Sequence, residues 1–332
     1  MTTGKILVVA EHQDGRIARA TWEALAAGQK LAHDTGGTLS AAILGDGVSG
    51  LASELAATEV EEVLIAESPA LKEYTADGYS LALQSILKDR PAQYVVFGHT
   101  YQVRDFAPKL AAALGGGFIS DCLGYQVEDG RCIFTRQVFQ GKFNADVEPD
   151  GEPPWLISFQ AGAFRQDAVQ RGAAAAKITP LTVDVPAANV RTQPSERFRE
   201  AKQSVDLTQA EIIVAAGRGI KGPENLELVQ KLAKALGGEV GASRPICDNE
   251  WLPMDRQIGS SGQTVAPKLY VALGISGAIQ HQVGMKGSRT IVAVNRDPEA
   301  PIFEIATYGI VGDLFEIVPL LIEEIQRRKA ES

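Results

Sequence analysis

The sequence predicts an α/β protein with two domains, each a mostly parallel sheet covered by helices. Apolar runs of strand length alternate with helix-like segments through most of both halves, which is typical of parallel sheets. A polar stretch with two prolines and no hydrophobic period, Val185–Gln203, separates the halves. The 332 residues suit about two domains of roughly 150 residues each. We assign residues 1–190 to an N-terminal α/β domain, 191–205 to a linker and 206–332 to a C-terminal domain.

In the first domain, strand and helix patterns alternate until about Gly115. The predicted strands are Ile6–Ala10, Thr38–Leu44, Glu62–Ala66 and Tyr94–Gly98. The predicted helices are Arg19–Ala32, Ser49–Ala57, Tyr79–Lys88 and Asp105–Leu114. Beyond Gly115 a turn at Glu128–Gly130 precedes an alternating run, Cys132–Phe139, which indicates antiparallel strands. A Pro/Gly loop at Glu148–Pro154 and a strand at Trp155–Phe159 follow.

The same alternation restarts in the second domain. It begins with a strand at Glu211–Ala216, a helix at Leu226–Leu236 and a short strand at Gly238–Val240. The segment from Lys268 to Phe303 then holds a strand, a glycine turn, a helix and a strand within about 30 residues, the size of a βαβ unit. Its predicted elements are Leu269–Leu273, Ala278–Met285 and Thr290–Val294. A helix at Leu314–Arg327 ends the domain.

The glycine turn of this βαβ unit is the most informative feature of the chain. A right-handed crossover sets the helix N-terminus, with its unpaired N–H groups, beside the carboxyl end of the first strand, where phosphate binds well. Asn295 follows Gly274 by about 20 positions, where a dinucleotide fold places its ribose-reading side chain. However, Gly274 and Gly277 form G-x-x-G rather than G-x-G-x-x-G. Spacing alone therefore leaves a nucleotide site and a plain tight turn equally open.

Composition excludes several other classes of protein. The net charge of −9 and the pI near 5.1 argue against a nucleic-acid partner, because phosphate backbones bind clustered Lys and Arg. No apolar run approaches the ~20 residues that span a bilayer, so we expect no membrane insertion. Cys122, Cys132 and Cys247 lack C-x-x-C spacing, which argues against a disulfide framework and a zinc site. A strand already begins at Lys5, without room for a signal peptide before it, so we expect a cytoplasmic protein.

Polar groups gather in loops that follow the predicted strands of the second domain. Arg218 stands between two glycines, which let the backbone turn sharply, although a solvated loop arginine is the simpler interpretation. Ser243 and Arg244 add a hydroxyl and a second cation after the next strand. The loop at Gln257–Thr264 is rich in hydroxyls and glycine and can present backbone N–H groups to an oxyanion or a flavin edge.

His281 is the histidine best placed for a ligand. It lies early in the predicted helix after Gly274, beside Gln280, and helical side chains lean toward the N-terminus. The positive end of the helix disfavours imidazolium, so we expect a neutral ring that donates a hydrogen bond, with a structural histidine as the alternative. The spacing shows no Ser/His/Asp, Cys/His or paired-carboxylate arrangement. These groups suit the binding and electrostatic tuning of a cofactor better than covalent or acid–base catalysis.

Six stretches of the second half resemble, in order, the FAD domain of the electron transfer flavoprotein (ETF) α subunit. They are GRG at 217–219, GASR at 241–244, QIGSSG at 257–262, GISGAIQH at 274–281, TIVAVNRDPEAPIF at 290–303 and YGIVGDLF at 308–315. The first half resembles the family more weakly, through LVVAEH at 7–12, RDFAPKLAAAL at 104–114 and TRQVFQGKFNADV at 135–147. The resemblance implies a Rossmann-like FAD-binding fold for residues 206–332 and a first domain that contacts a β subunit.

The resemblance also implies which residues line FAD. They are Arg218, Ser243, Arg244, Gln257, Ile258, Gly259, Ser260, Ser261, Gly274, Ser276, Gly277, Ala278, Ile279, Gln280, His281, Asn295, Asp313 and Leu314. Asn295 and Asp313 are expected at the adenosine end. Ser261 is expected to face flavin N5, His281 the C2 carbonyl, and Arg244 the isoalloxazine ring as a fixed cation. No catalytic residue and no metal ligand is implied.

The chain departs from the family pattern at several positions. The family usually reads Gly-Gln-Thr-Gly where this chain has Gly259-Ser260-Ser261-Gly262. Ser261 keeps the hydroxyl but lacks the methyl group that restricts χ1 in threonine, so its hydrogen bond to flavin N5 is expected to be looser. In the first domain Gln137 replaces the usual proline, and Val103 replaces a usual glycine before Arg104-Asp105.

The family implies an electron carrier without a chemical substrate of its own. Such a carrier is a heterodimer whose β subunit holds AMP or a second FAD. It accepts electrons from dehydrogenases, such as the acyl-CoA dehydrogenases of fatty acid β-oxidation, and passes them to ETF–quinone oxidoreductase or a similar acceptor. The alternatives are an electron-bifurcating ETF linked to NADH, a flavin- or NAD-dependent dehydrogenase, and a nucleotide-sensing or scaffold module that uses only the first domain.

Overall fold

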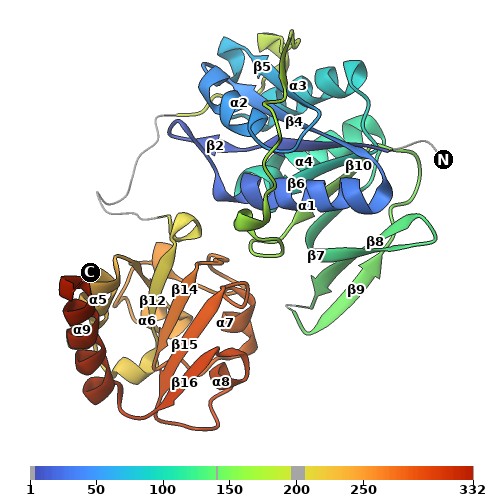
Figure 1. Ribbon diagram of the computed structural model, residues 1–332. Helices are drawn as coiled ribbons and strands as arrows, with labels where there is room; N and C mark the ends of the chain where they lie inside the picture. Colours follow the sequence, from blue (N-terminus) through green and yellow to red (C-terminus); the bar gives the residue numbers. More distant parts are fainter. Residues whose placement is uncertain (1–3, 140, 196–205, 332) are drawn as a thin grey trace. The chain divides into compact units, whose positions relative to one another are not determined.

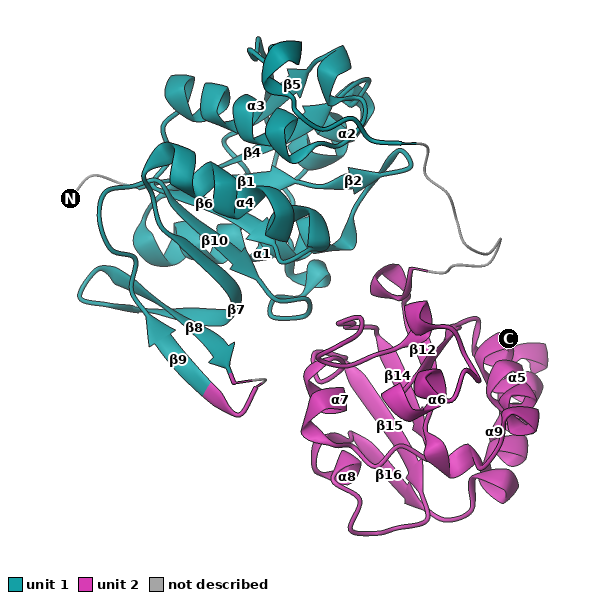
Figure 2. Cartoon of the chain, turned by 180° about the vertical axis from the view of Figure 1, so that it is seen from behind, with its two compact units in different colours: residues 1–138, 144–197 teal, residues 139–143, 198–332 magenta. Residues whose placement is uncertain are grey.

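The computed structural model describes residues 4–139, 141–195 and 206–331. The chain forms two compact units, which contain residues 1–138 and 144–197, and residues 139–143 and 198–332, respectively (Figures 1 and 2). The division between them falls within the predicted linker, of which residues 196–205 lie outside the described part of the chain. Both units are α/β, so the predicted fold class is confirmed.

The first unit contains one nine-stranded sheet in the order β11-β5-β4-β1-β6-β10-β7-β8-β9. Its strands are β1 (Lys5–Ala10), β4 (Thr38–Gly45), β5 (Glu62–Glu67), β6 (Tyr94–Gly98), β7 (Phe118–Glu128), β8 (Arg131–Val138), β9 (Phe143–Val147), β10 (Trp155–Phe159) and β11 (Lys177–Leu181). A small hairpin consists of β2 (His12–Gln13) and β3 (Arg16–Ile17). The helices are α1 (Arg19–Thr35), α2 (Ser49–Ala56), α3 (Ala76–Asp89) and α4 (Tyr101–Leu114). The sheet is parallel except toward β8, which pairs antiparallel with β7.

The second unit contains a five-stranded, all-parallel sheet in the order β13-β12-β14-β15-β16. Its strands are β12 (Ile212–Ala216), β13 (Glu239–Ala242), β14 (Leu269–Leu273), β15 (Thr290–Asn295) and β16 (Tyr308–Val311). Its helices are α5 (Leu226–Leu236), α6 (Arg244–Asp248), α7 (Ile279–Val283), α8 (Ile302–Ile305) and α9 (Leu314–Glu331). Relative to the chain, the strand order is 2-1-3-4-5, so the order reverses between β12 and β14. A doubly wound sheet binds ligands at such a switch point, outside the carboxyl ends of its strands.

Both faces of the second sheet are buried. Side chains alternate between the two faces of a strand, and on β12 Ile213 and Val214 are both completely buried. Val214 packs in a core with Val229 of α5 and Val318 of α9, whereas Ile213 belongs to the opposite core, which includes Ile302 of α8. Helices α5 and α9 thus cover one face and the segment with α7 and α8 the other (Figure 1). Burial on both faces explains why these strands are continuous apolar runs.

Several elements differ from the sequence-based expectation. The helix predicted at Ala278–Met285 is limited to Ile279–Val283, because Gly284 caps it and lies where a Cβ atom would meet the backbone nitrogen of Gly259 at 2.4 Å. Strand β16 was not predicted, since Tyr308 is 64% exposed and Gly309 follows it, without the apolar run of a buried strand. Strands β7, β9 and β11 were also missed as individual elements.

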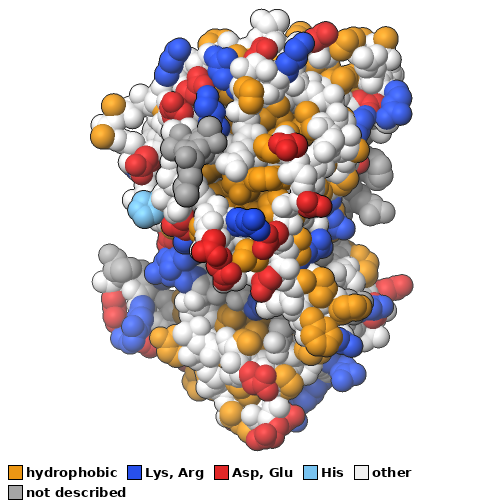
Figure 3. Space-filling view, turned by 90° about the vertical axis from the view of Figure 1, so that its right-hand side faces the viewer, with side chains coloured by type: hydrophobic (Ala, Val, Ile, Leu, Met, Phe, Trp, Pro, Cys, Tyr) orange, Lys and Arg blue, Asp and Glu red, His pale blue; other side chains and the backbone are white. Residues whose placement is uncertain are grey.

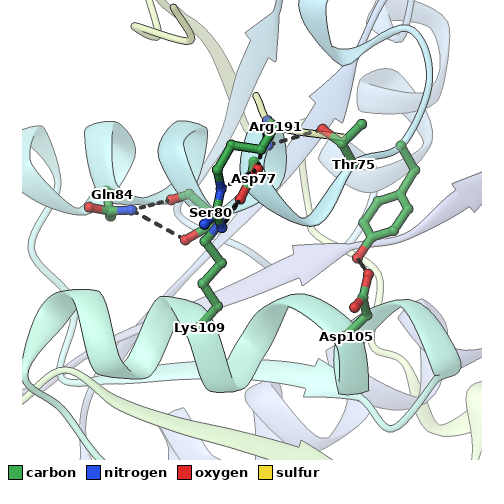
Figure 4. Close-up of polar contacts among 9 residues, drawn as sticks. Thr75, Asp77, Ser80, Gln84, Asp105, Lys109 and Arg191 are labelled. Carbon is green, nitrogen blue, oxygen red and sulfur yellow. Dashed lines mark hydrogen bonds and ion pairs between the residues drawn. The ribbon is translucent and has the colours of Figure 1, made fainter. Parts of the chain in front are cut away.

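A buried carboxylate fixes the end of the first unit to its helices. The side chain of Asp77 on α3 is only 5% exposed, and it forms ion pairs with Lys109 of α4 and with Arg191 (Figure 4). The Arg191 backbone N–H also donates to Asp77 Oδ2 at 2.8 Å, and its guanidinium donates to both carboxylate oxygens. Arg191, predicted as the first linker residue, is therefore held by the first unit.

Charged side chains, helix hydropathy and possible metal ligands all bear on what the chain could bind. On the face drawn in Figure 3, Lys and Arg alternate with Asp and Glu, rather than forming a basic field. Within the described ranges, no helix has both the length and the apolar character required to cross a bilayer. In the same ranges no group of three His, Cys, Asp or Glu side chains is arranged to hold a metal. Cys122, Cys132 and Cys247 are buried free thiols.

We predict that Asp77→Asn lowers the free energy of unfolding of the first unit by about 1–3 kcal/mol. The change leaves Lys109 and Arg191 without their shared counterion, but both partners are partly exposed, so the loss is smaller than for a fully buried pair. Urea denaturation measures the difference. Asp184→Asn, at an exposed position, is the matched control and is expected to have little effect. Equal stability of the two variants would contradict this role for Asp77.

Candidate functional site

One cavity of about 720 Å³ lies at the switch point of the second sheet. Its walls come from the loops that follow the carboxyl ends of β12, β13, β14 and β15, and from the loop around residues 257–261. Fourteen of the predicted site residues line it: Arg218, Ser243, Arg244, Gln257, Ile258, Gly259, Ser260, Ser261, Gly274, Ser276, Ala278, Gln280, His281 and Asn295. The structure thus brings together side chains that lie far apart in the sequence.

The remaining four predicted residues lie outside this cavity. Asp313 and Leu314 line a smaller cavity of about 180 Å³, which shares Gly219, Gly274 and Asn295 with the large one. Gly277 packs against α8, and Ile279 is 50% exposed on α7. Contact with a cofactor stays a prediction for these four residues and for the fourteen that line the large cavity.

Several lining residues were missed as individual site residues. They are Gly219, Pro245, Ile275, Asp297, Ala300 and Pro301 in the large cavity, and Lys221, Arg296 and Gly312 in the small one. Most of them lie inside stretches that carry the family resemblance, which is the signal that could have identified them.

Glycine allows the β12 and β14 loops to meet at the bottom of the cavity. A Cβ atom on Gly274 would lie 2.7 Å from the Cα atom of Gly219, and one on Gly217 would lie 2.4 Å from the carbonyl oxygen of Gly274. Gly274 also has a φ of +61°, which L side chains rarely adopt. The two loops are joined by hydrogen bonds from Gly217 N–H to Leu273 O and from Gly219 N–H to Gly274 O. These glycines are therefore required by backbone contact and not only by a turn.

The turn after β14 presents unpaired donors to the cavity. Among the described residues, no acceptor is bound to the backbone N–H groups of Ser276, Gly277 and Ala278. Gly277 has a φ of +83°, and a Cβ atom there would lie 2.2 Å from the backbone nitrogen of Ile302. Successive free N–H groups in a glycine-rich turn form an anion-binding concavity. The turn can therefore bind a phosphate or pyrophosphate group without rearranging its own hydrogen bonds.

Two arginines add positive charge to the walls. Arg218 is exposed, and the structure gives it no ion pair among the described residues. Arg244 begins α6, and its Nε atom lies 3.2 Å from Asp248 Oδ2, with both side chains more than half exposed. The wall thus carries one arginine free to meet an anion and one whose charge is partly balanced.

His281 is neutral and held on both sides. Its Nδ1 atom lies 3.1 Å from the carbonyl oxygen of Ile258, so Nδ1 carries the proton and donates. Its Nε2 atom accepts a hydrogen bond from the Tyr270 hydroxyl at 2.9 Å. Burial lowers the pKa of His281 to about 4, so the expected neutral ring is explained by desolvation rather than by the short helix α7. Neither ring nitrogen is free, so a hydrogen bond from His281 to a ligand requires breaking one of these.

The residues expected at the adenosine end are fixed by local hydrogen bonds. The Asn295 side chain donates to Ile275 O at 2.9 Å and accepts from the Asp297 N–H at 3.1 Å. Asp313 accepts from the Phe315 N–H at the start of α9 and pairs with Arg296 at 2.6 Å. The backbone hydrogen bond lowers the pKa of Asp313, so it is ionised. The small cavity therefore has a carboxylate wall with a neighbouring cation.

We predict that Gly277→Ala destabilises the second unit by more than about 1 kcal/mol. Alanine disfavours the positive φ at this position, and its Cβ atom collides with the Ile302 backbone. Gly50→Ala is the matched control, because this helical glycine has open space around it and should gain about 0.4–1 kcal/mol. Urea denaturation of both variants tests the sign of each effect, and a neutral Gly277→Ala would contradict the close contact.

The buried imidazole predicts a pH dependence of stability. The unfolded chain binds a proton on His281 below a pH of about 6.5, whereas the folded chain does so only below about 4. Because the unfolded state then binds more protons, the free energy of unfolding falls by about 3 kcal/mol as the pH drops through this window. Denaturation curves across the window should show that His281→Gln removes this contribution. His33→Gln, at a side chain that is 90% exposed, should retain it, and an unchanged slope in His281→Gln would contradict the assignment.

Comparison with known proteins agrees with this architecture. The family model of the electron transfer flavoprotein FAD-binding domain matches residues 206–286, and that of the electron transfer flavoprotein domain matches residues 6–186. The chain is 42% identical to the ETF subunit alpha of Bacillus subtilis, over 99% of each chain. It is 38% identical to that of Thermoanaerobacterium thermosaccharolyticum, over 98% of each chain. It is 36% identical to the acryloyl-CoA reductase electron transfer subunit beta of Anaerotignum propionicum, over 98% of this chain and 96% of that one. The chain therefore belongs to the electron transfer flavoprotein α-subunit family, whose C-terminal domain binds FAD.

Proposed function

We propose that this protein is the FAD-binding subunit of a heterodimeric carrier that accepts electrons from flavoprotein dehydrogenases, such as acyl-CoA dehydrogenases. It then passes them to ETF–quinone oxidoreductase or a similar acceptor. The observation that carries the proposal is the switch-point cavity, which combines free backbone donors, two arginines and several hydroxyls. The chain also matches electron transfer flavoprotein α subunits along nearly its whole length, which supports the role of an electron carrier.

The cavity fits the pyrophosphate of FAD. The free N–H groups of Ser276 to Ala278 supply donors, and the glycines at 217, 219 and 274 keep side chains out of the path to them. The exposed guanidinium of Arg218 is the cation on this wall that has the freedom to pair with a phosphate. We assign Asn295, Asp313 and Leu314, which lie at the small cavity, to the adenosine end.

The flavin ring is assigned to the other end, against Ser261, Arg244 and His281. When bound, FAD supplies reversible one- and two-electron chemistry. The protein's contribution is to fix the ring and to surround the negative charge of its reduced form with donors and cations. Ser261 offers an exposed hydroxyl and Arg244 a guanidinium, whereas His281 shapes the wall as a neutral, fully bonded ring.

The lining favours a carrier over a dehydrogenase with its own substrate. Such a dehydrogenase needs a base or acid positioned on the substrate. Among the described residues that line the large cavity, the titratable groups other than arginine are His281 and Asp297. Both His281 nitrogens are engaged, and Asp297 is exposed and caps the Glu299 N–H. Neither is arranged to move a substrate proton.

The β subunit, with AMP or a second FAD, belongs to the same proposal. A role in fatty acid β-oxidation and a cytoplasmic location stay predictions from the sequence. The relative from Anaerotignum propionicum is named as an electron transfer subunit of an acryloyl-CoA reductase, which supports a partner enzyme for this chain as well.

Anaerobic reduction of the FAD-loaded protein tests the proposed function. An acyl-CoA dehydrogenase with its acyl-CoA substrate should bleach the flavin absorbance, whereas acyl-CoA alone should not. Bleaching by NADH alone would instead favour the bifurcating alternative. Bleaching by a free small substrate without any dehydrogenase would contradict the carrier.

We predict that Arg244→Ala lowers the first reduction potential of bound FAD by roughly 60 mV, and by up to about 130 mV. A charge-assisted contact contributes about 1.5–3 kcal/mol, and ~1.4 kcal/mol corresponds to 59 mV for one electron. We expect the lower end, because Arg244 is 68% exposed and paired with Asp248.

Potentiometry of the two variants checks this role. Arg328→Ala is the matched control. Arg328 has the same charge as Arg244 and also pairs with a carboxylate four residues away, but it lies on α9, outside the cavity. This substitution should leave the potential unchanged. An unchanged potential in Arg244→Ala with FAD still bound would contradict the assignment.

A further inference from the structure

The hydroxyl of Ser261 accepts a hydrogen bond from a buried side-chain amide. Gln257 is only 2% exposed, and its Nε2 atom lies 3.0 Å from Ser261 Oγ. Ser261 itself is exposed at the cavity wall. An amide nitrogen is a donor only, so the serine oxygen accepts this hydrogen bond and its own hydrogen is left to point elsewhere. The contact therefore sets the direction in which Ser261 can donate.

The backbone gives the Gln257 side chain a fixed starting point. Its N–H donates to Met254 O at 3.1 Å, and its carbonyl accepts from the Gln263 N–H at 2.8 Å. Gly262 folds over it so closely that a Cβ atom there would lie 2.4 Å from the Gln257 carbonyl oxygen and 3.0 Å from its Cγ atom. A side chain confined in this way has few alternative rotamers, so its amide reaches Ser261 at little further entropic cost.

The other polar atom of the Gln257 amide, its oxygen, forms no competing hydrogen bond among the described residues. Gln257 Oε1 is buried and has no hydrogen-bond partner among the described residues. Leaving a buried carbonyl unpaired costs about 1–3 kcal/mol. The fold tolerates this cost at the cavity wall, next to the hydroxyl that Gln257 contacts, and an unpaired buried group of this kind requires an explanation.

Serine requires such support more than threonine does. Threonine carries two heavy atoms on Cβ, which restrict its χ1 angle, whereas an exposed serine samples its staggered rotamers more freely. This chain has Ser261 where its family usually has threonine. A hydrogen bond from Gln257 supplies the restraint that the missing methyl group would give.

We propose that Gln257 is a positioning residue that orients the Ser261 hydroxyl toward the flavin ring. Gln257 acts through Ser261 rather than by its own contact with the ring. The accepted hydrogen bond also polarises the hydroxyl and makes it a better donor. This inference rests on the proposed FAD site, and it predicts that the effect of Gln257 on FAD depends on the residue at position 261.

A double-mutant cycle tests the inference with FAD as the probe. Gln257→Met keeps an unbranched side chain of similar length and removes both polar atoms. In the full-length protein it should raise the Kd for FAD about three- to tenfold, the equivalent of one lost hydrogen bond. It should also lower the first reduction potential by up to about 59 mV, the one-electron equivalent of tenfold. In a Ser261→Ala background, Gln257→Met should change the Kd by less than about twofold.

Ser261→Thr supplies the matched rescue. Because threonine restricts its own hydroxyl, Gln257→Met should have a smaller effect in the Ser261→Thr background than in the wild type. Gln257→Glu is the second variant if Gln257→Met does not fold. Its carboxylate accepts from Ser261 and reverses the hydrogen bond, and its effect should likewise shrink in Ser261→Ala.

The outcomes separate the inference from the proposed function. Equal effects of Gln257→Met in the wild-type and Ser261→Ala backgrounds would overturn the positioning role while leaving the FAD site intact. The same conclusion would follow if Gln257→Met changed neither the Kd nor the potential. Failure of the wild-type protein to bind FAD would overturn both.

Discussion

The close contact between the β12 and β14 loops is the constraint on which the site depends. These strands are neighbours at the position where the strand order reverses, so their carboxyl ends open the crevice in which a doubly wound sheet binds its ligand. Glycine at 217, 219 and 274 lets the two backbones touch and hydrogen-bond there. Any side chain at these positions would separate the loops and fill the path to the free N–H groups of the next turn. The backbone contact between these loops therefore shapes the floor of the proposed FAD site.

A second layer of the site consists of side chains that are held by buried partners. Tyr270 and the Ile258 carbonyl fix His281 by hydrogen bonds, and the buried Gln257 amide donates a hydrogen bond to Ser261. Such buried partners restrict the rotamers and proton positions of groups that face a ligand. The charged groups, in contrast, are exposed and lie at the walls. This arrangement suits a protein that binds and tunes a cofactor, since a fixed polar environment stabilises charge without reorganising.

Most of the fold could be predicted from the sequence because its sheets are largely parallel and buried. Strands such as β12 and β14 are continuous apolar runs, and a helix pattern separates them. Strand β16 was missed because half-exposed edge strands lack this signal, and α7 is short because Gly284 must approach Gly259. The glycine turn and the polar loops after the strands already indicated many of the residues that line the cavity, and the resemblance to a family completed the predicted set. The partners of His281 could not be predicted, because tertiary packing alone brings Tyr270 and Ile258 to its ring.

We propose that FAD lies in the switch-point cavity with its pyrophosphate on the β14 turn and its ring at Ser261. The most direct measurement is an experimental structure of the FAD-loaded protein. We expect phosphate oxygens within hydrogen-bond distance of the N–H groups of Ser276 to Ala278, and the flavin ring beside Ser261. FAD bound outside this cavity, or with its ring at Asp313 and its adenine at Ser261, would contradict it.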